Sequence, residues 1–434
     1  MALSKESFLA GLDNSFHQYL GTKEQPIYLG LSGGVDSVAL LHLLVEAGLG
    51  HRVKAIHIHH GLSQNADAWY RFCEALCQQY QVAFKGHKVE LDTQKHSIEE
   101  AARIARYDIF ASYLNKNAYL LLAHHAGDQA ETLMFRLLRG TGGKGLAGMP
   151  AKRELGAGFL YRPLLSFDKT NLIQYVKQNG LTWVEDESNQ DEAFSRNHIR
   201  HQIIPKLQAF EPQAECRIEQ AAKRLAFDYQ MLANLSRDKL SAWQAQDTSL
   251  KLDAIAALDQ EQRVFWLRQY LELFSISLTQ AQVLAVNESF FTEQGKQPCF
   301  EHKLARLMRF QNRLYVLPLQ IPAQVSKISP NQELEREYDV YHFSLSTNLE
   351  FDENAFSLGN KPDTQVLVQK NGLSRKLKKW FNDEQVPVWW REHLPYLYYQ
   401  DELVAIGDLW VKPDWQDFIN LDWRPKALLT WPKA

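Results

Sequence analysis

Short apolar runs alternate with amphipathic stretches through the first half of the chain, and this alternation constrains the fold more than any other feature. The apolar runs typical of strands are residues 26–31, 53–59, 82–89 and 118–123. The stretches with helical periodicity between them are residues 37–47, 66–79, 98–114 and 128–139. Strands that alternate with helices need crossover connections, which predicts a doubly wound, mostly parallel sheet of the α/β class. Ligands of such sheets bind beyond the carboxyl ends of the strands, so we expect the functional site there.

The second half of the chain begins with a different pattern. Helical periodicity dominates residues 211–288, and its clearest stretches are 221–235 and 260–274. Residues 306–317 are typical of a hairpin. We therefore expect a mainly helical middle domain at residues 213–322.

A polar segment that contains several prolines separates this region from an aromatic, β-rich C-terminus. Residues 396–400 and 402–406 pair naturally as a hairpin, and residues 374–382 are predicted to form a basic helix. A length of 434 residues favours two or three domains. We predict three, a catalytic α/β domain, the middle domain and a small α+β C-terminal domain, at residues 1–212, 213–322 and 335–434.

Composition argues against several classes of protein. The net charge of −3 gives no overall sign of a nucleic-acid partner, although local basic stretches occur. The four cysteines are too scattered for a disulfide framework, which favours a reducing compartment. No apolar stretch approaches the ~20 residues that span a bilayer, and residues 1–6 carry an acid without the apolar core of a signal peptide. We expect a cytoplasmic protein that does not use a membrane.

The first predicted strand runs directly into a loop of small residues, after which a helix begins at once. The loop consists of Ser32, Gly33, Gly34, Val35, Asp36 and Ser37. Because Gly33 and Gly34 lack Cβ atoms, backbone amides at this helix start can approach an anion closely. The hydroxyls of Ser32 and Ser37 add donors, and Asp36 can hold Mg²⁺ against phosphate oxygens. The alternative is an ordinary strand–turn–helix in which Asp36 or Ser37 is only an N-cap.

This loop is not a Walker loop, because the lysine of that motif and its spacing are absent. It resembles the loop of the PP-loop ATP pyrophosphatases, which cleave ATP between the α and β phosphates and leave an adenylated intermediate. Further segments resemble one family within that group, the tRNA(Ile)-lysidine synthetases, and these are residues 57–63, 100–107, 123–132, 139–143, 186–189 and 196–200. The resemblance continues to the C-terminal domain and covers nearly the whole chain. Gly127 departs from it, since many relatives carry an aspartate there, while Asp128 and Glu131 remain.

The resemblance implies an ATP-dependent carbon–nitrogen ligase that modifies tRNA(Ile). In the implied reaction, the oxygen of the wobble cytidine attacks the α-phosphate of ATP and expels pyrophosphate. The amine of free L-lysine then attacks the activated ring carbon and expels AMP, and the lysidine that forms changes codon and amino-acid specificity. The resemblance also implies contacts with the anticodon region and acceptor stem, and it is compatible with a homodimer. Two alternatives stay open, another adenylating tRNA-modifying enzyme of the thiolating type and an RNA-binding protein without catalysis.

The acidic residues of these motifs suit that chemistry. A Mg²⁺ held by Asp36 and Glu131 would offset the negative charge that builds on the departing pyrophosphate. Asp128 lies one helical turn before Glu131 and could hold the ammonium of lysine, then accept its proton. The alternative is a solvated acidic helix start that complements the helix dipole.

Arginine and histidine side chains are further candidates for the nucleotide. Arg103 and Arg106 lie three residues apart on a predicted helix, so both can hydrogen-bond one anion. The alternative is an exposed face paired with neighbouring glutamates. His57 and His124 are predicted to contact the nucleotide, with plain packing as the alternative. Strand alternation sends His60 to the face opposite His57, and no cysteine accompanies them, which argues against zinc.

Cys73 and Cys77 lie four residues apart on a predicted helix beside Phe72 and Leu76. Thiols on such an apolar face are usually buried and unreactive. This argues against the thiolating alternative, because relatives that thiolate tRNA generally need reactive cysteines near the active site.

Two basic stretches are candidates for RNA contacts. The first contains Arg196 and Arg200. The family resemblance adds Asn189, which lies shortly before them in the sequence. The second lies between residues 370 and 379 and has no acid, and its predicted tRNA-binding side chains are Arg375, Lys376, Lys378 and Lys379. Tryptophans follow, and these we expect in the core of the small domain rather than as stacking platforms. The alternative for the basic run is a solvated helix face.

Overall fold

The computed structural model describes residues 3–22, 25–61, 63–89, 98–187, 195–292, 297–320, 326–346, 351–363, 366–370, 373–426, 429 and 431. The chain divides into two compact units, Met1–Leu232 and Ala233–Ala434. Among the helices in these ranges, none combines the length and the apolar character that crossing a bilayer requires.

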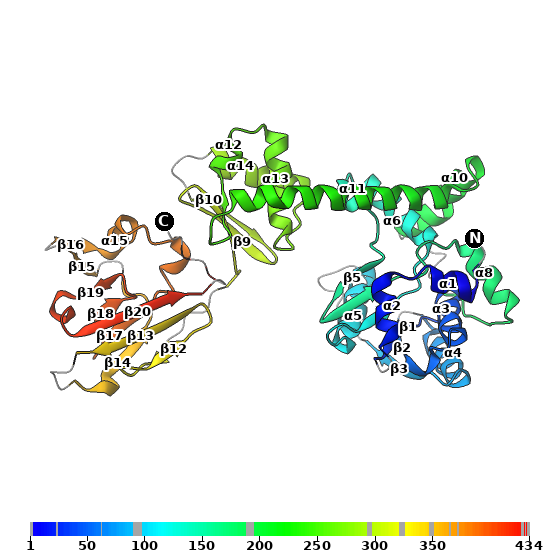
Figure 1. Cartoon of the computed structure of the whole chain (residues 1–434), viewed down its shortest axis with the longest axis horizontal. Coiled ribbons are helices and arrows are strands. Elements are labelled where there is room, and N and C mark those ends of the chain that lie inside the picture. The colour runs from blue at the N-terminus through cyan, green and yellow to red at the C-terminus, as the bar shows by residue number, and fades with distance from the viewer. Residues whose placement is uncertain are drawn as a thin grey trace. The chain divides into compact units, whose positions relative to one another are not determined.

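A six-stranded sheet organises the first unit (Figure 1), with strand order β3-β2-β1-β4-β6-β5. Its strands are β1 Ile27–Gly30, β2 Val53–His59, β3 Ala83–Lys88, β4 Tyr119–Leu121, β5 Lys152–Leu155 and β6 Gly158–Tyr161. All neighbours pair in parallel except β5, which runs antiparallel to β6. The four strands predicted from the sequence are β1 to β4, so the mostly parallel sheet is confirmed.

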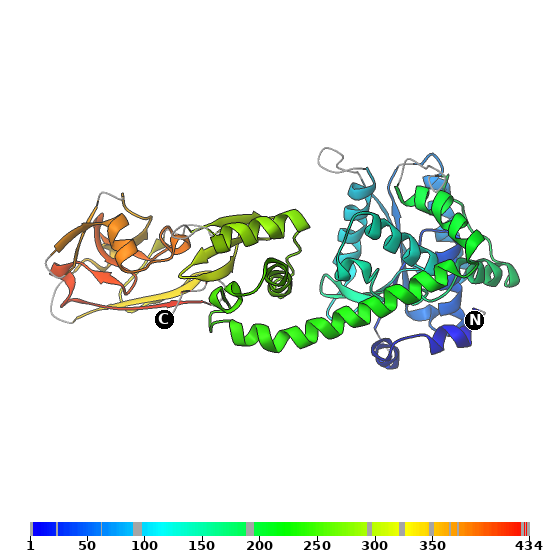
Figure 2. The same ribbon diagram turned by 90° about the horizontal axis from the view of Figure 1, so that it is seen from above.

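Side chains of the central strands alternate between two cores. Leu29 points into the larger core and Tyr28 into the smaller one, as the period of two along a strand requires. The helices that fill the larger core are α1 Lys5–Ala10, α2 Asn14–Gly21, α3 Val35–Glu46, α4 Ala66–Gln79 and α8 Lys169–Gln178. The smaller core is covered by α5 Ile98–Tyr113, through Phe110. Helices therefore cover both faces (Figures 1 and 2), and the doubly wound fold is confirmed.

The remaining helices of the first unit follow β4 and β6. They are α6 Ala126–Leu138, α7 Gly143–Leu146, α9 Ser195–His198, the π-helical segment η3 Ile199–Ile203 and α10 Ile204–Phe210, with the 3₁₀ turn η1 Gly50–Arg52 earlier in the chain. The long helix α11 Ala214–Trp243 begins in this unit. A π-helical segment is rare and often marks a functional position, which makes η3 a place to look for site residues.

The second unit starts with helices and a small sheet. Its helices are α12 Asp253–Ala256, α13 Gln260–Glu272 and α14 Gln280–Thr292, and its strands are β7 Leu250–Lys251, β8 Cys299–His302, β9 Ala305–Phe310 and β10 Arg313–Leu317. The predicted hairpin is β9–β10, and its turn residues Gln311 and Asn312 have φ angles of 45° and 57°. The faces of this hairpin serve two cores, since Leu307 packs in one and Met308 in the other. We keep the three-domain division as a proposal, because the two cores share this hairpin.

The aromatic second core of this unit lies among short antiparallel strands. They are β11 Ser326–Lys327, β12 Glu333–Glu335, β13 Asp339–Leu345, β14 Phe356–Gly359, β15 Leu367–Lys370, β16 Leu373–Lys376, β17 Tyr396–Tyr399, β18 Glu402–Ile406, β19 Trp410–Val411 and β20 Ile419–Pro425. Helix α15 Leu377–Asp383 and the 3₁₀ turns η4 Glu353–Ala355, η5 Val388–Trp390 and η6 Pro413–Trp415 complete it. The predicted β17–β18 hairpin is confirmed. Trp380, Trp389 and Trp390 are buried in this core, as expected.

The predicted basic helix at residues 374–382 is wrong in its first part. Arg375 and Lys376 lie on strand β16, where they pair with Val368 and Leu367 of β15. The helix begins only at Leu377, because the apolar spacing that buries one helix face starts there and continues at Trp380 and Phe381. The basic residues therefore belong to two elements rather than to one helix.

Candidate active site

The small-residue loop connects β1 to α3 with the geometry of an anion-binding turn. Helix α3 begins at Val35, and its N-cap Gly34 gives it no side-chain cap, so the first amides of the helix face outward uncapped. Gly33 has a φ of +89°, and a Cβ there would lie 2.8 Å from Cγ2 of Val184. The backbone nitrogen of Val184 donates to the Gly33 carbonyl at 3.0 Å. Only glycine fits this position without strain.

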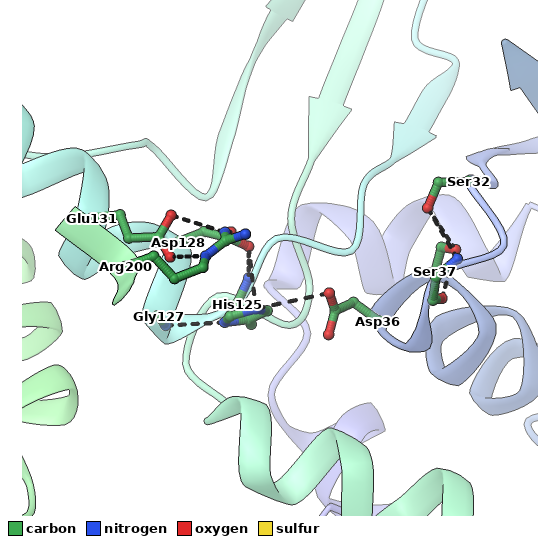
Figure 3. Close-up of polar contacts among 9 residues, drawn as sticks. Ser32, Asp36, Ser37, His125, Gly127, Asp128, Glu131 and Arg200 are labelled. Carbon is green, nitrogen blue, oxygen red and sulfur yellow. Dashed lines mark hydrogen bonds and ion pairs between the residues drawn. The ribbon is translucent and has the colours of Figure 1, made fainter. Parts of the chain in front are cut away.

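The two serine hydroxyls brace the loop internally (Figure 3). Ser37 Oγ accepts from the Gly33 nitrogen at 3.1 Å and donates to the Gly34 carbonyl at 3.0 Å. Ser32 Oγ lies 3.2 Å from Ser37 Oγ and accepts from the Gly34 nitrogen at 3.3 Å. These bonds hold the loop open around its amides before any ligand binds.

Asp36 carries the feature that best fits a cation. Its Oδ1 is buried without a hydrogen-bond partner among the described residues, and burial raises the pKa of this carboxyl group more than the neighbouring His125 and Lys169 lower it. An unpaired buried carboxylate oxygen beside a phosphate-binding turn is a ligand suited to Mg²⁺. Within the described ranges no three His, Cys, Asp or Glu side chains form a metal-binding group, so phosphate oxygens would have to complete the coordination.

His125 lies between two of the carboxylates and was not among the residues chosen from the sequence. Its Nδ1 accepts from the Gly127 nitrogen at 3.0 Å, so Nε2 is the ring nitrogen that carries a proton. That Nε2 lies 3.8 Å from Asp36 Oδ2 and 3.6 Å from Asp128 Oδ2 (Figure 3). Asp128 also accepts from the His125 backbone nitrogen at 3.0 Å, which forms a capping box at the start of α6. The carboxylate three residues after the histidine was the available sequence signal.

Glu131 is engaged by an arginine of the π-helical segment. Arg200 donates to both of its oxygens, from Nε at 2.5 Å and from Nη2 at 2.9 Å, and reaches Asp128 Oδ1 at 3.4 Å. Burial alone would lower the pKa of Arg200, but its bond to Glu131 outweighs burial and raises it. Arg200 thus lies among the acidic residues, and Glu131 can reach a cation only where Arg200 releases it.

Arg103 and Arg106 both lie beside one ring. Their Cζ atoms are 5.3 Å and 5.9 Å from the centroid of Tyr107. His124 contacts another arginine, since its Nδ1 accepts from Nε of Arg162 at 3.1 Å. Burial lowers the pKa of His124 to about 4, so its imidazole is neutral.

His57 contacts the residue that directly precedes the loop. Its Nδ1 donates to the Leu31 carbonyl at 2.9 Å, and its ring meets Tyr70 edge-on with centroids 5.9 Å apart. Burial lowers its pKa, so the ring is neutral. The contact positions the end of β1, and the predicted contact of His57 with the nucleotide stays a prediction.

Comparison with known proteins agrees with this geometry. Residues 5–207 match the model of the PP-loop domain, and residues 357–423 match that of the TilS substrate C-terminal domain. The tRNA(Ile)-lysidine synthase of Serratia proteamaculans (strain 568) is 32% identical over 92% of this chain and 96% of its own length. Those of Vibrio cholerae O1 (El Tor Inaba N16961) and Pseudomonas syringae pv. tomato (DC3000) are each 34% identical over 90% and 92% of this chain, and 92% and 91% of their own length.

The chain belongs to the tRNA(Ile)-lysidine synthase family. The family and the enzyme class predicted from the motifs, an ATP-dependent PP-loop ligase, are thereby confirmed. Members of this family modify tRNA.

The two cysteines of α4 are buried, as predicted, whereas Cys216 is half-buried and Cys299 is exposed. Cys73 and Cys77 have no exposed surface, and burial raises the pKa of each to about 12. Neither is a thiolate at neutral pH, so neither has the reactivity that a thiolating enzyme needs.

The residues predicted to bind the substrate RNA have varied positions. Asn189 lies outside the described residues. Arg196 is half-buried on α9, and its charge contributes to the low pKa of His124. In the second unit, Arg375 forms an ion pair with Asp383. Lys376, Lys378 and Lys379, which are also predicted to bind tRNA, are exposed.

Proposed function

We propose that this enzyme ligates L-lysine to the wobble cytidine of tRNA(Ile) at the expense of ATP. The cytosine oxygen is adenylated first, with loss of pyrophosphate, and the lysine amine then displaces AMP to give lysidine. The family relationship supports the reaction, since relatives that match over nine-tenths of the chain carry this name. The observation that carries the proposal is the uncapped start of α3 beside the unpaired oxygen of Asp36.

In the first step the loop receives the charge of the departing pyrophosphate. The uncapped amides of α3 donate to phosphate oxygens, and the helix dipole adds to their effect. These donors are held in place by the serine network, so they need little reorganisation as charge develops. A bound Mg²⁺ would neutralise phosphate charge, with Asp36 as its ligand and Glu131 as a second one once Arg200 has moved.

In the second step the ammonium of lysine must lose a proton before its nitrogen can attack. Asp128 is half-buried, and the neighbouring His125 and Arg200 keep its pKa below the usual value despite the desolvation that would raise it. An ionised carboxylate is the form that can both hold an ammonium and accept its proton. We assign both roles to Asp128, with His125 fixing its position.

We assign the RNA contacts to two groups of residues. Asn189, Arg196 and Arg200 would serve the anticodon region close to the reaction. The basic residues of β16 and α15, Arg375, Lys376, Lys378 and Lys379, would serve the acceptor stem. We expect the enzyme to work in the cytoplasm, where tRNA and free lysine meet, and a homodimer is compatible with this scheme.

Labelled ATP tests the reaction directly. With the purified enzyme, release of pyrophosphate should require tRNA(Ile), and release of AMP should require both tRNA(Ile) and lysine. Cleavage of the terminal phosphate, or AMP release that ignores lysine, would contradict the proposal. A methionine tRNA with the same wobble base serves as the negative control.

A further inference from the structure

Four arginines from three parts of the chain gather around a single tyrosine in the first unit. The Cζ atoms of Arg103 and Arg106 lie 5.3 Å and 5.9 Å from the centroid of Tyr107, and that of Arg153 lies 5.0 Å from it. Arg162 is the fourth, since its charge acts on the Tyr107 hydroxyl. Two of these arginines come from α5, one comes from β5, and Arg162 directly follows β6. We refer to the five residues as the arginine cluster.

The arginine cluster is short of negative charge. In the described part of the chain, Arg103, Arg153 and Arg162 form no ion pair with a carboxylate. Arg162 is buried at 4% exposure, yet its hydrogen bonds go to neutral acceptors, His124 Nδ1 at 3.1 Å and the Pro150 carbonyl at 2.7 Å. Burial, together with the nearby arginines, lowers its pKa to about 10. Gathering like charges around a buried guanidinium costs free energy that an anion would recover.

The pKa of Tyr107 also reflects the excess of positive charge around it. Burial alone would raise the pKa of this phenol, but the surrounding guanidinium groups outweigh burial and lower it. The ring is flanked by cations, so it acts as a platform for guanidinium groups rather than for a base. The site is therefore built to receive an anion.

The cluster adjoins the active site through two consecutive histidines. Arg162 donates to His124, and the next residue, His125, lies 3.8 Å from Asp36 at the start of α3. Both β4 and β6 end here, at the edge of the sheet where ligands of this fold bind. An anion in the cluster would thus lie beside the reacting nucleotide.

We propose that the arginine cluster binds a backbone phosphate of the substrate RNA next to the nucleotide that is modified. This rests on the proposed function. The triphosphate of ATP already has the uncapped start of α3, so the second anion at this site is the phosphodiester. Guanidinium forks match phosphate oxygens in geometry and charge, which makes arginine suited to this task.

Arg153→Ala tests the proposal, because the contacts of Arg153 within the described residues are with Tyr107 and the Glu154 carbonyl, away from the loop and from the acidic residues of the active site. Arg71→Ala is the matched control, since it removes one positive charge from an exposed position on α4. Dissociation constants for tRNA(Ile) are measured over a range of salt, alongside the KM for ATP in pyrophosphate release. We expect Arg153→Ala to weaken tRNA binding about five- to tenfold and to lower the salt slope by about 0.7–0.9, with an unchanged KM for ATP. Arg71→Ala should change none of these.

Two results would overturn the proposal. Unchanged tRNA affinity and salt slope in both Arg153→Ala and Tyr107→Phe/Arg153→Ala would show that the arginine cluster does not bind the RNA. A raised KM for ATP with unchanged tRNA affinity would indicate that the arginine cluster binds the triphosphate of ATP instead. Arg153→Lys, which keeps the charge, should recover much of the affinity, and thermal melts exclude misfolding. If the wild-type enzyme binds tRNA but releases no lysine-dependent AMP, the proposed function is wrong. The tRNA dissociation constants of the variants would still test the arginine cluster in that case.

Discussion

Arg200 and Glu131, which lie 69 residues apart in the sequence, form a two-point ion pair that is largely buried. Replacing Glu131 by Gln leaves Arg200 with the more distant carboxylate of Asp128, at 3.4 Å. We expect Glu131→Gln to lose about 3 kcal/mol of unfolding free energy, because a charge that is largely buried loses its close, two-point partner. Chemical denaturation measures this. The double variant Glu131→Gln/Arg200→Met should be more stable than the single one, and a single variant as stable as wild type would show that the pair contributes nothing.

Asp128 is predicted to act in the second step alone. Asp128→Asn keeps the size of the side chain but removes the negative charge that holds an ammonium. We expect tRNA-dependent pyrophosphate release to continue, while lysine-dependent AMP release falls at least about 100-fold. The two products are followed in the same reaction with differently labelled ATP. If the lysine-dependent step is unchanged while adenylation proceeds, Asp128 has another role.

Gly33 is predicted to be indispensable for nucleotide binding. Gly33→Ala places a Cβ 2.8 Å from Cγ2 of Val184 at a φ of +89°, so the turn must shift. We expect ATP affinity to fall about tenfold or more, since distortions of this kind cost 1–3 kcal/mol. Gly140→Ala is the control, because Gly140 also has a positive φ, +65°, but nothing lies within 4 Å of its Cβ position. Calorimetric titration with ATP would contradict the prediction if both variants bound equally.

The strands and helices of the first unit are predictable from sequence because their patterns are local. Strand β2 at Val53–His59 and helix α4 at Ala66–Gln79 have the bounds that apolar periodicity predicts. One helix at residues 374–382 was the wrong prediction because strand β16 depends on its partner β15, which lies earlier in the chain. The dipeptide Asn371-Gly372, a strong hairpin signal, stands between the two segments that pair as β15 and β16.

The candidate site was only partly predictable, because its charges are paired by the fold. The loop residues are adjacent in sequence, so their arrangement follows from local geometry. The partners of the buried arginines come from distant elements, as Arg162 finds His124 and Arg200 finds Glu131. No periodicity reports such pairings. Arg200 is a basic residue that suggested RNA from sequence, and the fold also brings it beside Glu131 and Asp128, which its position in the chain does not reveal.

The exposed lysines at the start of α15 are predicted to contact RNA. Lys378→Ala/Lys379→Ala removes two positive charges without disturbing the buried face of the helix. We expect weaker tRNA binding and a salt slope lower by about 1.5. Lys327→Ala, an exposed lysine on β11, is the control. Filter binding over a salt series measures both, and an unchanged slope in the double variant would remove these lysines from the interface.

Asp36 is predicted to lower the stability of the fold at neutral pH in return for its function. Burial raises its pKa in the folded chain, so its contribution to stability is full below the unfolded pKa and is lost as the pH rises through the folded value. Asp36→Asn removes the buried charge. We expect this variant to melt at a higher temperature than wild type at pH 7, by about 2–4 °C for each kcal/mol relieved.

The same difference should disappear below the ordinary pKa of aspartate, about 3.9, where the carboxyl group is protonated in both the folded and the unfolded chain. ATP-dependent pyrophosphate release should be lost in Asp36→Asn at every pH, because the amide cannot replace a charged oxygen ligand. Thermal melts at both pH values and the product assay check the two expectations separately. A variant that is less stable than wild type at pH 7 would mean that the unpaired oxygen of Asp36 finds a partner in solution.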